Sequence, residues 1–346
     1  MKVTFLNKQK DRKTITCNDG EKLLHAGLRQ GIPLPYECGT GQCGTCIARA
    51  KPGTVQPNNS DLPGSKNLNL NKGEFLLCQC SVYEDCDILV DSKKLSHNHQ
   101  YSLPKHQDGH LHNFNIIAPD VYVADLELPN LINFQAGQFF LFKAPGIEGY
   151  RAYSMTSYNQ NTNQLNFVIK KVNQGKFTSI LFDHDTKSLD LETFGPLGKA
   201  TFDPEEKKDL LFITGGSGIA GIMSILDHAD KINYFTSNTA TIFFGARTFN
   251  DFFFIDKLTD IKKKYSNNVK LFFATSEENK KSLPQQISDH EVHRGYVHEV
   301  FSNKIGADCS EHIVFLGGPS VMVNSALPKI LELGIPAKNI RFDRFG

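Results

Sequence analysis

Hydrophobic residues divide the chain into regions of different periodicity. Between residues 113 and 200, short apolar runs are separated by Gly and Asn clusters, a pattern typical of strands in a small antiparallel barrel. After residue 208 the apolar runs are continuous, as in strands buried on both faces, and helix-type segments such as 218–230 separate them. This alternation predicts a parallel, doubly wound sheet. The expected strands are FNIIA (114–118), VYVADLEL (121–128), QFFLFKA (138–144) and LNFVIKKV (165–172) in the barrel, and DLLFITGG (209–216), TATIFFGAR (239–247), NVKLFFAT (268–275) and HIVFLGGP (312–319) in the sheet.

The chain has 346 residues, which is enough for two or three domains, and we predict three. A polar stretch with several histidines, SHNHQYSLPKHQDGHLH, has no hydrophobic period and predicts a solvated linker rather than a metal site. The predicted boundaries are an N-terminal domain over 1–97, the linker over 98–110, the barrel over 111–203 and the sheet domain over 204–346.

Composition excludes several classes of protein. The formal net charge is +1, so the basic excess expected of a nucleic-acid-binding protein is missing. No apolar stretch approaches the roughly 20 residues that cross a bilayer, and the opening MKVTFLNKQKDRKT lacks the apolar core of a secretory signal. We therefore expect a cytoplasmic, monomeric protein that binds neither a membrane nor nucleic acid.

Cysteine spacing in the N-terminal domain indicates an iron–sulfur centre. Four residues separate Cys38 from Cys43, two separate Cys43 from Cys46, and Cys78 follows after 31 more. This is the spacing that holds a [2Fe–2S] cluster through four thiolates. The glycines between these cysteines allow the backbone to curl around such a cluster and to donate N–H groups to its sulfurs.

Other interpretations of these cysteines stay open at this point. A zinc site favours two CxxC pairs, and the sequence has one here. Cys80 competes with Cys78 as the fourth ligand, although the LLCQ context favours Cys78. Cys17, Cys86 and Cys309 are interpreted as small core residues.

A flavin site is indicated in the barrel by Arg151, Tyr153 and Ser154, which follow the strand at 138–144. The Arg can clamp a pyrophosphate, the Tyr offers a flat face to an isoalloxazine ring, and the Ser hydroxyl can hydrogen-bond its N5 edge. In isolation, RAYS equally describes an exposed Arg beside a barrel Tyr. A glycine and hydroxyl turn that can hold phosphate near a helix start strengthens the flavin interpretation, and its residues are Lys170, Gly175, Lys176, Phe177 and Thr178.

A nicotinamide site is indicated by the glycine-rich turn after the first strand of the sheet domain. Its residues are Gly215, Gly216, Ser217, Gly218 and Ile219. Such a turn lets backbone amides approach a pyrophosphate, although a simple turn before a helix has the same composition. A Rossmann dehydrogenase would carry an acidic residue at the end of the second strand, but that strand ends near Arg247, so this class is excluded.

These motifs resemble known families. Residues 1–95 are similar to plant-type ferredoxins, which implies a β-grasp fold and one-electron transfer. RAYS and FGPLG (194–198) resemble the ferredoxin reductase-like flavoproteins, as do GGSGIAG, Gly245-Ala246-Arg247 and the run from Gly317, Gly318 and Pro319 to Met322. The family often has a Cys where this chain has Gly317, so no thiol role is expected. NIRFDRFG resembles a family ending whose aromatic residue packs on the flavin, here Phe345, although a core position is equally compatible.

The resemblance implies FAD, NADH and a [2Fe–2S] cluster as cofactors, with Tyr153, Ser154 and Phe345 at the reacting flavin. NADPH-using relatives often have Ser-Arg after the third strand. This chain has Ser276 and Glu277 there, which predicts NADH, while Arg247 favours the phosphate weakly.

The domain order resembles reductase components of soluble di-iron monooxygenases of the toluene, phenol and methane type. It implies electron transfer from NADH through FAD and the cluster to an oxygenase (hydroxylase) component. Reductases of Rieske dioxygenases or of deoxysugar dehydrases are the alternatives, followed by a non-redox zinc and nucleotide-binding protein.

Overall fold

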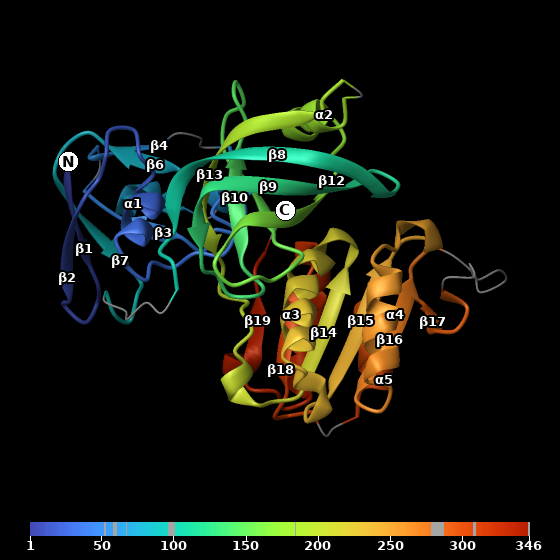
Figure 1. Ribbon diagram of the computed structural model, residues 1–346. Helices are drawn as coiled ribbons and strands as arrows, with labels where there is room; N and C mark the ends of the chain where they lie inside the picture. The colour runs from blue at the N-terminus through green and yellow to red at the C-terminus, as the bar shows by residue number, and fades with distance from the viewer. Residues whose placement is uncertain are drawn as a thin grey trace.

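The computed structural model describes residues 1–51, 53–57, 61–66, 68–95, 101–183, 185–277, 287–306 and 309–344. Three domains follow one another along the chain and meet near its C-terminal end (Figure 1). They are a mixed sheet with one helix, an antiparallel barrel and a doubly wound parallel sheet, so the predicted fold class is confirmed.

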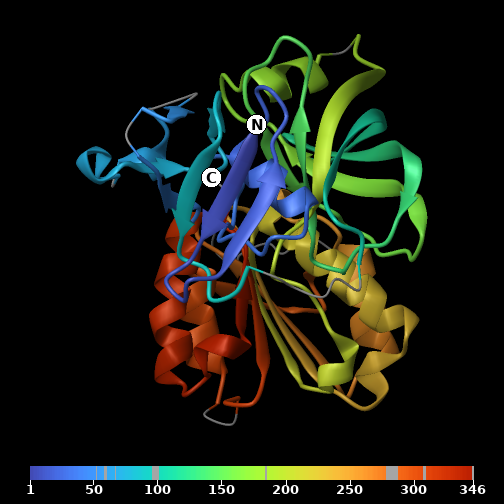
Figure 2. The ribbon, with the colours of Figure 1, turned by 90° about the vertical axis from the view of Figure 1, so that its left-hand side faces the viewer.

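The N-terminal domain has the strand order β2-β1-β7-β3-β5, with β1 and β7 parallel and the other pairs antiparallel. This is the β-grasp arrangement. Its strands are β1 (Lys2–Leu6), β2 (Arg12–Thr16), β3 (Ile47–Arg49), β4 (Val55–Pro57), β5 (Glu74–Leu76), β6 (Cys80–Val82) and β7 (Cys86–Val90). Helix α1 (Leu23–Arg29) is buried from Leu23 to Leu28, because it lies between this sheet and the barrel (Figure 2).

The middle domain is a six-stranded antiparallel sheet in the order β11-β10-β13-β8-β9-β12. A bridge between Met155 and Phe167 joins its two edges, and the Thr156 amide donates to the Asn166 carbonyl at 2.9 Å, so the sheet closes into a barrel. Its elements are β8 (Lys105–Ala118), β9 (Val121–Ile132), β10 (Phe139–Lys143), β11 (Arg151–Ser154), β12 (Thr162–Lys170), α2 (Lys176–Leu181) and β13 (Ser188–Leu197).

Strand β10 is apolar on both faces although it belongs to an antiparallel barrel. Phe140 and Phe142 point into the barrel core, whereas Phe139 and Leu141 pack with the N-terminal domain. Alternate residues of a strand face opposite sides, so the continuous run FFLF reflects burial between two domains.

The predicted linker over 98–110 was wrong for residues 105–110, which begin β8 and pair with β13. Inward and outward residues alternate there, but the inward positions hold Gln107 and Gly109, so no hydrophobic period reveals the strand. His106 and His110 therefore lie on a strand, while His97 and His99 fall outside the described residues.

The C-terminal domain is a parallel sheet in the order β17-β16-β15-β14-β18-β19. Helices cover both faces, with α3 and α4 on one side and α5 and α6 on the other (Figure 2). Its elements are β14 (Leu210–Gly215), α3 (Ile219–Lys231), β15 (Ala240–Ala246), α4 (Ile255–Lys264), β16 (Val269–Thr275), β17 (Glu291–Arg294), α5 (Val297–Lys304), β18 (Ile313–Gly317), α6 (Ser320–Glu332) and β19 (Ile340–Phe342).

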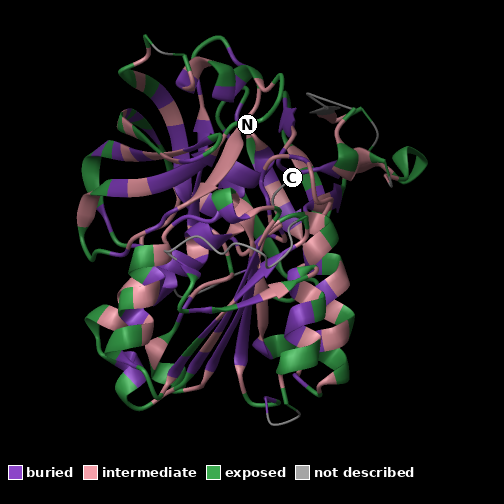
Figure 3. Ribbon diagram, turned by 90° about the vertical axis from the view of Figure 1, so that its right-hand side faces the viewer, coloured by how far each residue is buried: buried purple, intermediate pink, exposed green. Residues whose placement is uncertain are grey.

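The barrel and the C-terminal domain share one continuous core, and the strands of the parallel sheet are largely buried (Figure 3). The Gly137 amide donates to Ser224 Oγ at 2.7 Å, and the Tyr158 amide donates to Asp227 Oδ2 at 2.7 Å. Among the described residues, no helix is long and apolar enough to cross a membrane.

Replacing Ser224 tests this interface. In Ser224→Ala the buried Gly137 amide loses its acceptor, which costs about 1–3 kcal/mol of unfolding free energy. Urea unfolding followed by circular dichroism measures the change. Thr236→Ala, which removes an exposed hydroxyl, is the control, and equal stabilities of the two variants would contradict the prediction.

Candidate functional site

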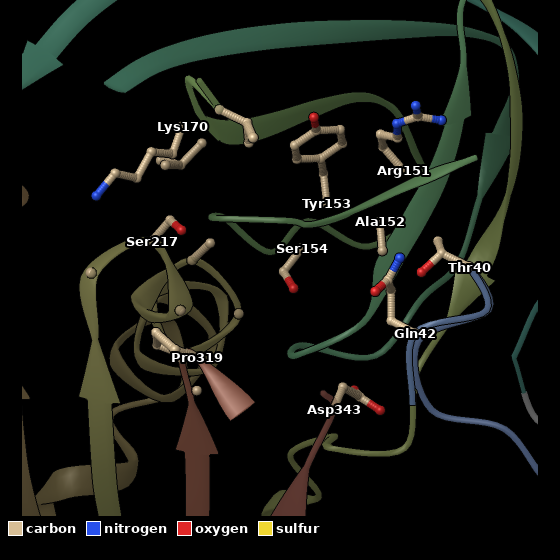
Figure 4. Close-up of a pocket in the computed structure, with 18 of the residues that line it drawn as sticks. Thr40, Gln42, Arg151, Ala152, Tyr153, Ser154, Lys170, Ser217, Pro319 and Asp343 are labelled. Atoms are coloured by element: carbon tan, nitrogen blue, oxygen red, sulfur yellow. The ribbon is translucent and has the colours of Figure 1, made fainter. Parts of the chain in front are cut away.

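A single cavity of about 2220 Å³ is lined by residues of all three domains. Thr40 and Gln42 of the cysteine loop, Ala152 and Ser154 of β11, and Ser217 of the glycine turn all face it (Figure 4). The cavity therefore connects the predicted iron–sulfur, flavin and nicotinamide sites.

The four predicted ligand cysteines come together as two pairs. The Sγ atoms of Cys38 and Cys43 are 3.2 Å apart, and those of Cys46 and Cys78 are 3.3 Å apart. Among the described residues, no three His, Cys, Asp or Glu side chains are arranged to hold a single metal ion. Two thiolates for each of two irons is the ligand set of a [2Fe–2S] cluster, so the residues fit that group better than one zinc ion.

The backbone of this loop is shaped for sulfur ligands. The Thr40 amide donates to Cys38 Sγ at 3.4 Å, and the Thr45 amide donates to Cys43 Sγ at 3.5 Å. Hydrogen bonds from the Cys43 thiol and from Thr40 lower the pKa of Cys38 to about 6, against the effect of burial. Gly41 has a φ of 84°, and a Cβ there would run into Leu62, so this turn requires glycine.

The fourth ligand can be tested by paired substitutions. Cys78 lies beside Cys46, whereas Cys80 begins β6. We expect Cys78→Ser to lose most of its iron and acid-labile sulfide, and Cys80→Ser to keep both. Iron analysis and the visible spectrum of protein purified without oxygen measure the difference. Loss of the cluster in Cys80→Ser alone would make Cys80 the ligand.

On β11, alternate side chains face opposite sides. Arg151 and Tyr153 lie on one side of the strand, while Ala152 and Ser154 lie on the other (Figure 4). Burial raises the pKa of the Tyr153 hydroxyl, so the ring stays neutral. A Cβ at position 221 would lie 3.5 Å from Ser154 Oγ, which is van der Waals contact distance, so Ser154 lies directly beside the first turn of α3.

Basic residues line the cavity at the predicted phosphate turn. Lys170, Gly175 and Lys176 face it, together with Lys171 and Gln174 of the same turn. The other predicted members are buried and shape the turn from behind. Phe177 packs 5.7 Å from the Tyr153 ring centre, and Thr178 Oγ1 accepts from the Val172 amide at 3.1 Å.

The nicotinamide motifs converge at the ends of β14, β15 and β18. Gly215, Gly216, Ser217 and Gly218 line the cavity, as do Gly245, Arg247, Gly317, Gly318, Pro319 and Met322. Ile219 is fully buried and begins α3. A Cβ on Gly317 would collide with the Gly218 carbonyl oxygen, so the two loops touch backbone to backbone.

This contact predicts the effect of a side chain at position 317. We expect Gly317→Ala to raise the Kd for NADH at least tenfold, because the two loops must separate to admit the methyl group. Spectral titration of the flavin-loaded protein measures Kd, and unchanged flavin content shows that the barrel is intact. Gly306→Ala, where a Cβ meets open space, is the control. Equal Kd values for both variants would contradict the expectation.

The sequence-predicted residue Glu277 is absent from the lining of the cavity, and its amide donates to the Arg247 carbonyl at 3.0 Å. Asp251 lines the cavity instead and pairs with Arg247 at 3.6 Å. Phe345 falls outside the described residues.

Asp343, which no sequence motif indicated, is buried in the cavity lining and accepts from the Lys199 and Ala200 amides, both at 3.3 Å. Burial raises its pKa to about 7. Only its position next to the predicted aromatic ending pointed to it.

Three family models match the chain in succession. They are a 2Fe-2S iron-sulfur cluster binding domain over residues 6–83, an oxidoreductase FAD-binding domain over 108–202 and an oxidoreductase NAD-binding domain over 212–327. The chain is an iron–sulfur flavoprotein oxidoreductase. The predicted cofactors FAD, NAD and [2Fe–2S] are thereby confirmed, and the non-redox zinc protein is excluded.

Known reductases align with this oxidoreductase over nearly its whole length. The ferredoxin–NAD(P)(+) reductase CarAd of Metapseudomonas resinovorans is 28% identical over 95% of this chain and 96% of its own. The phenol hydroxylase P5 protein of Acinetobacter pittii (strain PHEA-2) is 26% identical over 96% of this chain and 91% of its own. The solved ferredoxin reductase in carbazole 1,9a-dioxygenase superposes with a TM-score of 0.80 at 26% identity, covering 100% of this chain and 99% of that one.

Proposed function

We propose that this oxidoreductase carries electrons from NADH through FAD and the [2Fe–2S] cluster to the hydroxylase component of a multicomponent monooxygenase. The observation that carries the proposal is the single cavity shared by the cysteine loop, the flavin motif and the glycine turn. The similarity to the phenol hydroxylase P5 protein supports the choice of acceptor.

The chain's own residues account for binding and orientation. Arg151, Lys170 and Lys176 supply positive charge for the flavin pyrophosphate. Ser154 offers a hydroxyl at the side of β11 that faces the glycine turn (Figure 4). When bound, FAD would supply hydride acceptance and single-electron release, and the backbone of the glycine turn would hold the nicotinamide nucleotide in the cavity.

Thr40 and Gln42 line the cavity, and in the sequence they lie between the ligand cysteines Cys38 and Cys43. The backbone of this loop would therefore give electrons a covalent route from the cavity to the cluster. No acid or base on the chain is needed for the hydride itself, because hydride transfer moves the proton and both electrons together.

NADH remains the proposed donor, but the residue that supports this preference is Asp251 and not Glu277. A 2′-phosphate would need the positive charge of Arg247, but Arg247 forms an ion pair with Asp251. Asp251 also places a carboxylate in the lining of the cavity. A carboxylate repels a phosphate and can accept from a free 2′-hydroxyl.

A ring-hydroxylating dioxygenase is the second candidate acceptor. It is favoured by the reductase named for carbazole 1,9a-dioxygenase, which superposes over the full chain. Deoxysugar dehydrases stay the third alternative.

Anaerobic mixing of the holoprotein with NADH tests the proposal. We expect the flavin band to bleach first and the iron–sulfur bands second, and NADPH to be at least tenfold slower. Purified di-iron hydroxylase should then reoxidise the cluster faster than dioxygenase terminal components or deoxysugar dehydrases do. Reoxidation by a dioxygenase component alone would replace the proposed acceptor, and no bleaching by either nucleotide would overturn the proposal.

We also infer that the reductase works as a cytoplasmic monomer. Both inferences rest on the composition of the chain and on its resemblance to soluble reductases.

A further inference from the structure

A chain of ionisable side chains crosses the interface between the N-terminal domain and the barrel. His25 of α1 meets His106 of β8, with 3.2 Å between His25 Nδ1 and His106 Nε2. His106 Nδ1 in turn lies 2.9 Å from Glu192 Oε1 on β13. The nucleotide motifs use none of these three residues.

Glu192 determines which ring nitrogens of His106 and His25 carry protons. Hydrogen bonds from His106, Tyr150 and Lys143 hold the pKa of Glu192 far below its ordinary value, so it remains a carboxylate. A carboxylate only accepts, so the proton on His106 sits at Nδ1. In neutral His106, Nε2 is then an acceptor, and His25 must donate its Nδ1 proton to it.

With these tautomers, a second proton on His25 would have to bind at Nε2, and the docked structure disfavours a proton there. The His25 ring is fully buried, stacked on Phe194 with 4.0 Å between ring centres and edge-on to Tyr150 at 5.0 Å. Its Nε2 has no hydrogen-bond partner among the described residues. A proton there would place a charge and an unsatisfied N–H in an apolar contact. Burial, together with the nearby histidine and lysines, accordingly lowers the pKa of His25 well below its ordinary value.

The groups that face His25 come from every element packed around it. They are Lys22 just before α1, His106 on β8, Lys143 on β10, Tyr150 before β11 and Glu192 on β13. Two of the five are cations, so the surroundings oppose a positive charge on His25 electrostatically as well as by burial.

We propose that His25 and His106 form a proton-sensitive latch that positions the cluster-bearing domain against the barrel wall for electron transfer from the flavin. When the domains separate, water can reach His25 and its ring can accept a proton. Acid therefore favours the released domain, whereas neutral pH favours the docked one. The apolar contacts of Phe139 and Leu141 keep the docked state as the default, and the latch sets how firmly it is held.

The sign of the effect follows from linkage. His25 is neutral when docked and titrates near the ordinary histidine pKa of about 6.5 when released, so docking weakens as pH falls through that value. Between pH 7.5 and 5.5, one such group weakens docking about tenfold.

Hydrogen exchange of single amides in the holoprotein measures this change. The Gly198 amide donates to Tyr36 Oη at 3.0 Å across the latch interface. The Gly137 amide donates to Ser224 across the other domain interface and serves as an internal reference. After correction for intrinsic exchange, we expect the protection of Gly198 relative to Gly137 to fall about tenfold from pH 7.5 to 5.5.

Variants separate the latch from other groups that titrate in this range. His25→Phe keeps the ring stack but cannot be protonated. The protection of Gly198 relative to Gly137 should then change with pH only as far as Asp343 contributes, and that contribution is the same in the parent protein. His25→Gln, which also cannot titrate in this range, should give the same result and replaces the Phe variant if that variant does not fold. His110→Asn is the matched control, because His110 pairs with Asp190 on the same two strands at 2.7 Å and should keep the full response.

The outcomes are clear-cut. A response that keeps its full size in both His25 variants, that disappears in His110→Asn, or that is absent from the parent protein overturns the latch. A tenfold response that both His25 variants lose supports it.

Discussion

The apolar wall formed by β10 and β13 is the constraint on which the rest of the structure depends. Its inner face closes the barrel core through Phe140 and Phe142, and its outer face packs against the N-terminal domain. Leu141 lies where a Cβ on Gly39 would meet it at 3.1 Å, so the cysteine loop rests directly on this wall. A strand that must satisfy two cores cannot shift its register, since one residue of slip would exchange its faces. The fixed register of β10 therefore determines where the cysteine loop lies relative to the cavity.

The two domain interfaces differ in chemistry. The barrel and the C-terminal domain share one core, and hydrogen bonds to Ser224, Asp227 and Asp343 cross between them. A shared core suits hydride transfer, which needs reacting atoms in close and fixed contact. The N-terminal interface combines apolar packing with a histidine and carboxylate network. Electron transfer tolerates more variation in distance, and a carrier that also serves an outside partner gains from an adjustable contact.

Local motifs could be predicted from the sequence, whereas contacts between domains could not. The cysteine spacing, RAYS and the glycine turn each lie within one loop, so their chemistry is visible in a short stretch of chain. The strand at 105–110 was missed because Gln107 and Gly109 occupy its inward positions. Glu277 does not line the cavity whereas Asp251 does, and no local pattern in the sequence distinguishes these two carboxylates. Asp343 and His25 gain their properties from burial by other domains, which no local pattern encodes.

The touching backbones of Gly218 and Gly317 have a consequence for protein engineering. The atom in the way of a side chain at 317 is a carbonyl oxygen, which no substitution at position 218 removes. A library that randomises either position alone samples only strained sequences. Grafting the two loops together from a relative, as one structural unit, is the way to bring a thiol or any other group to that wall of the cavity.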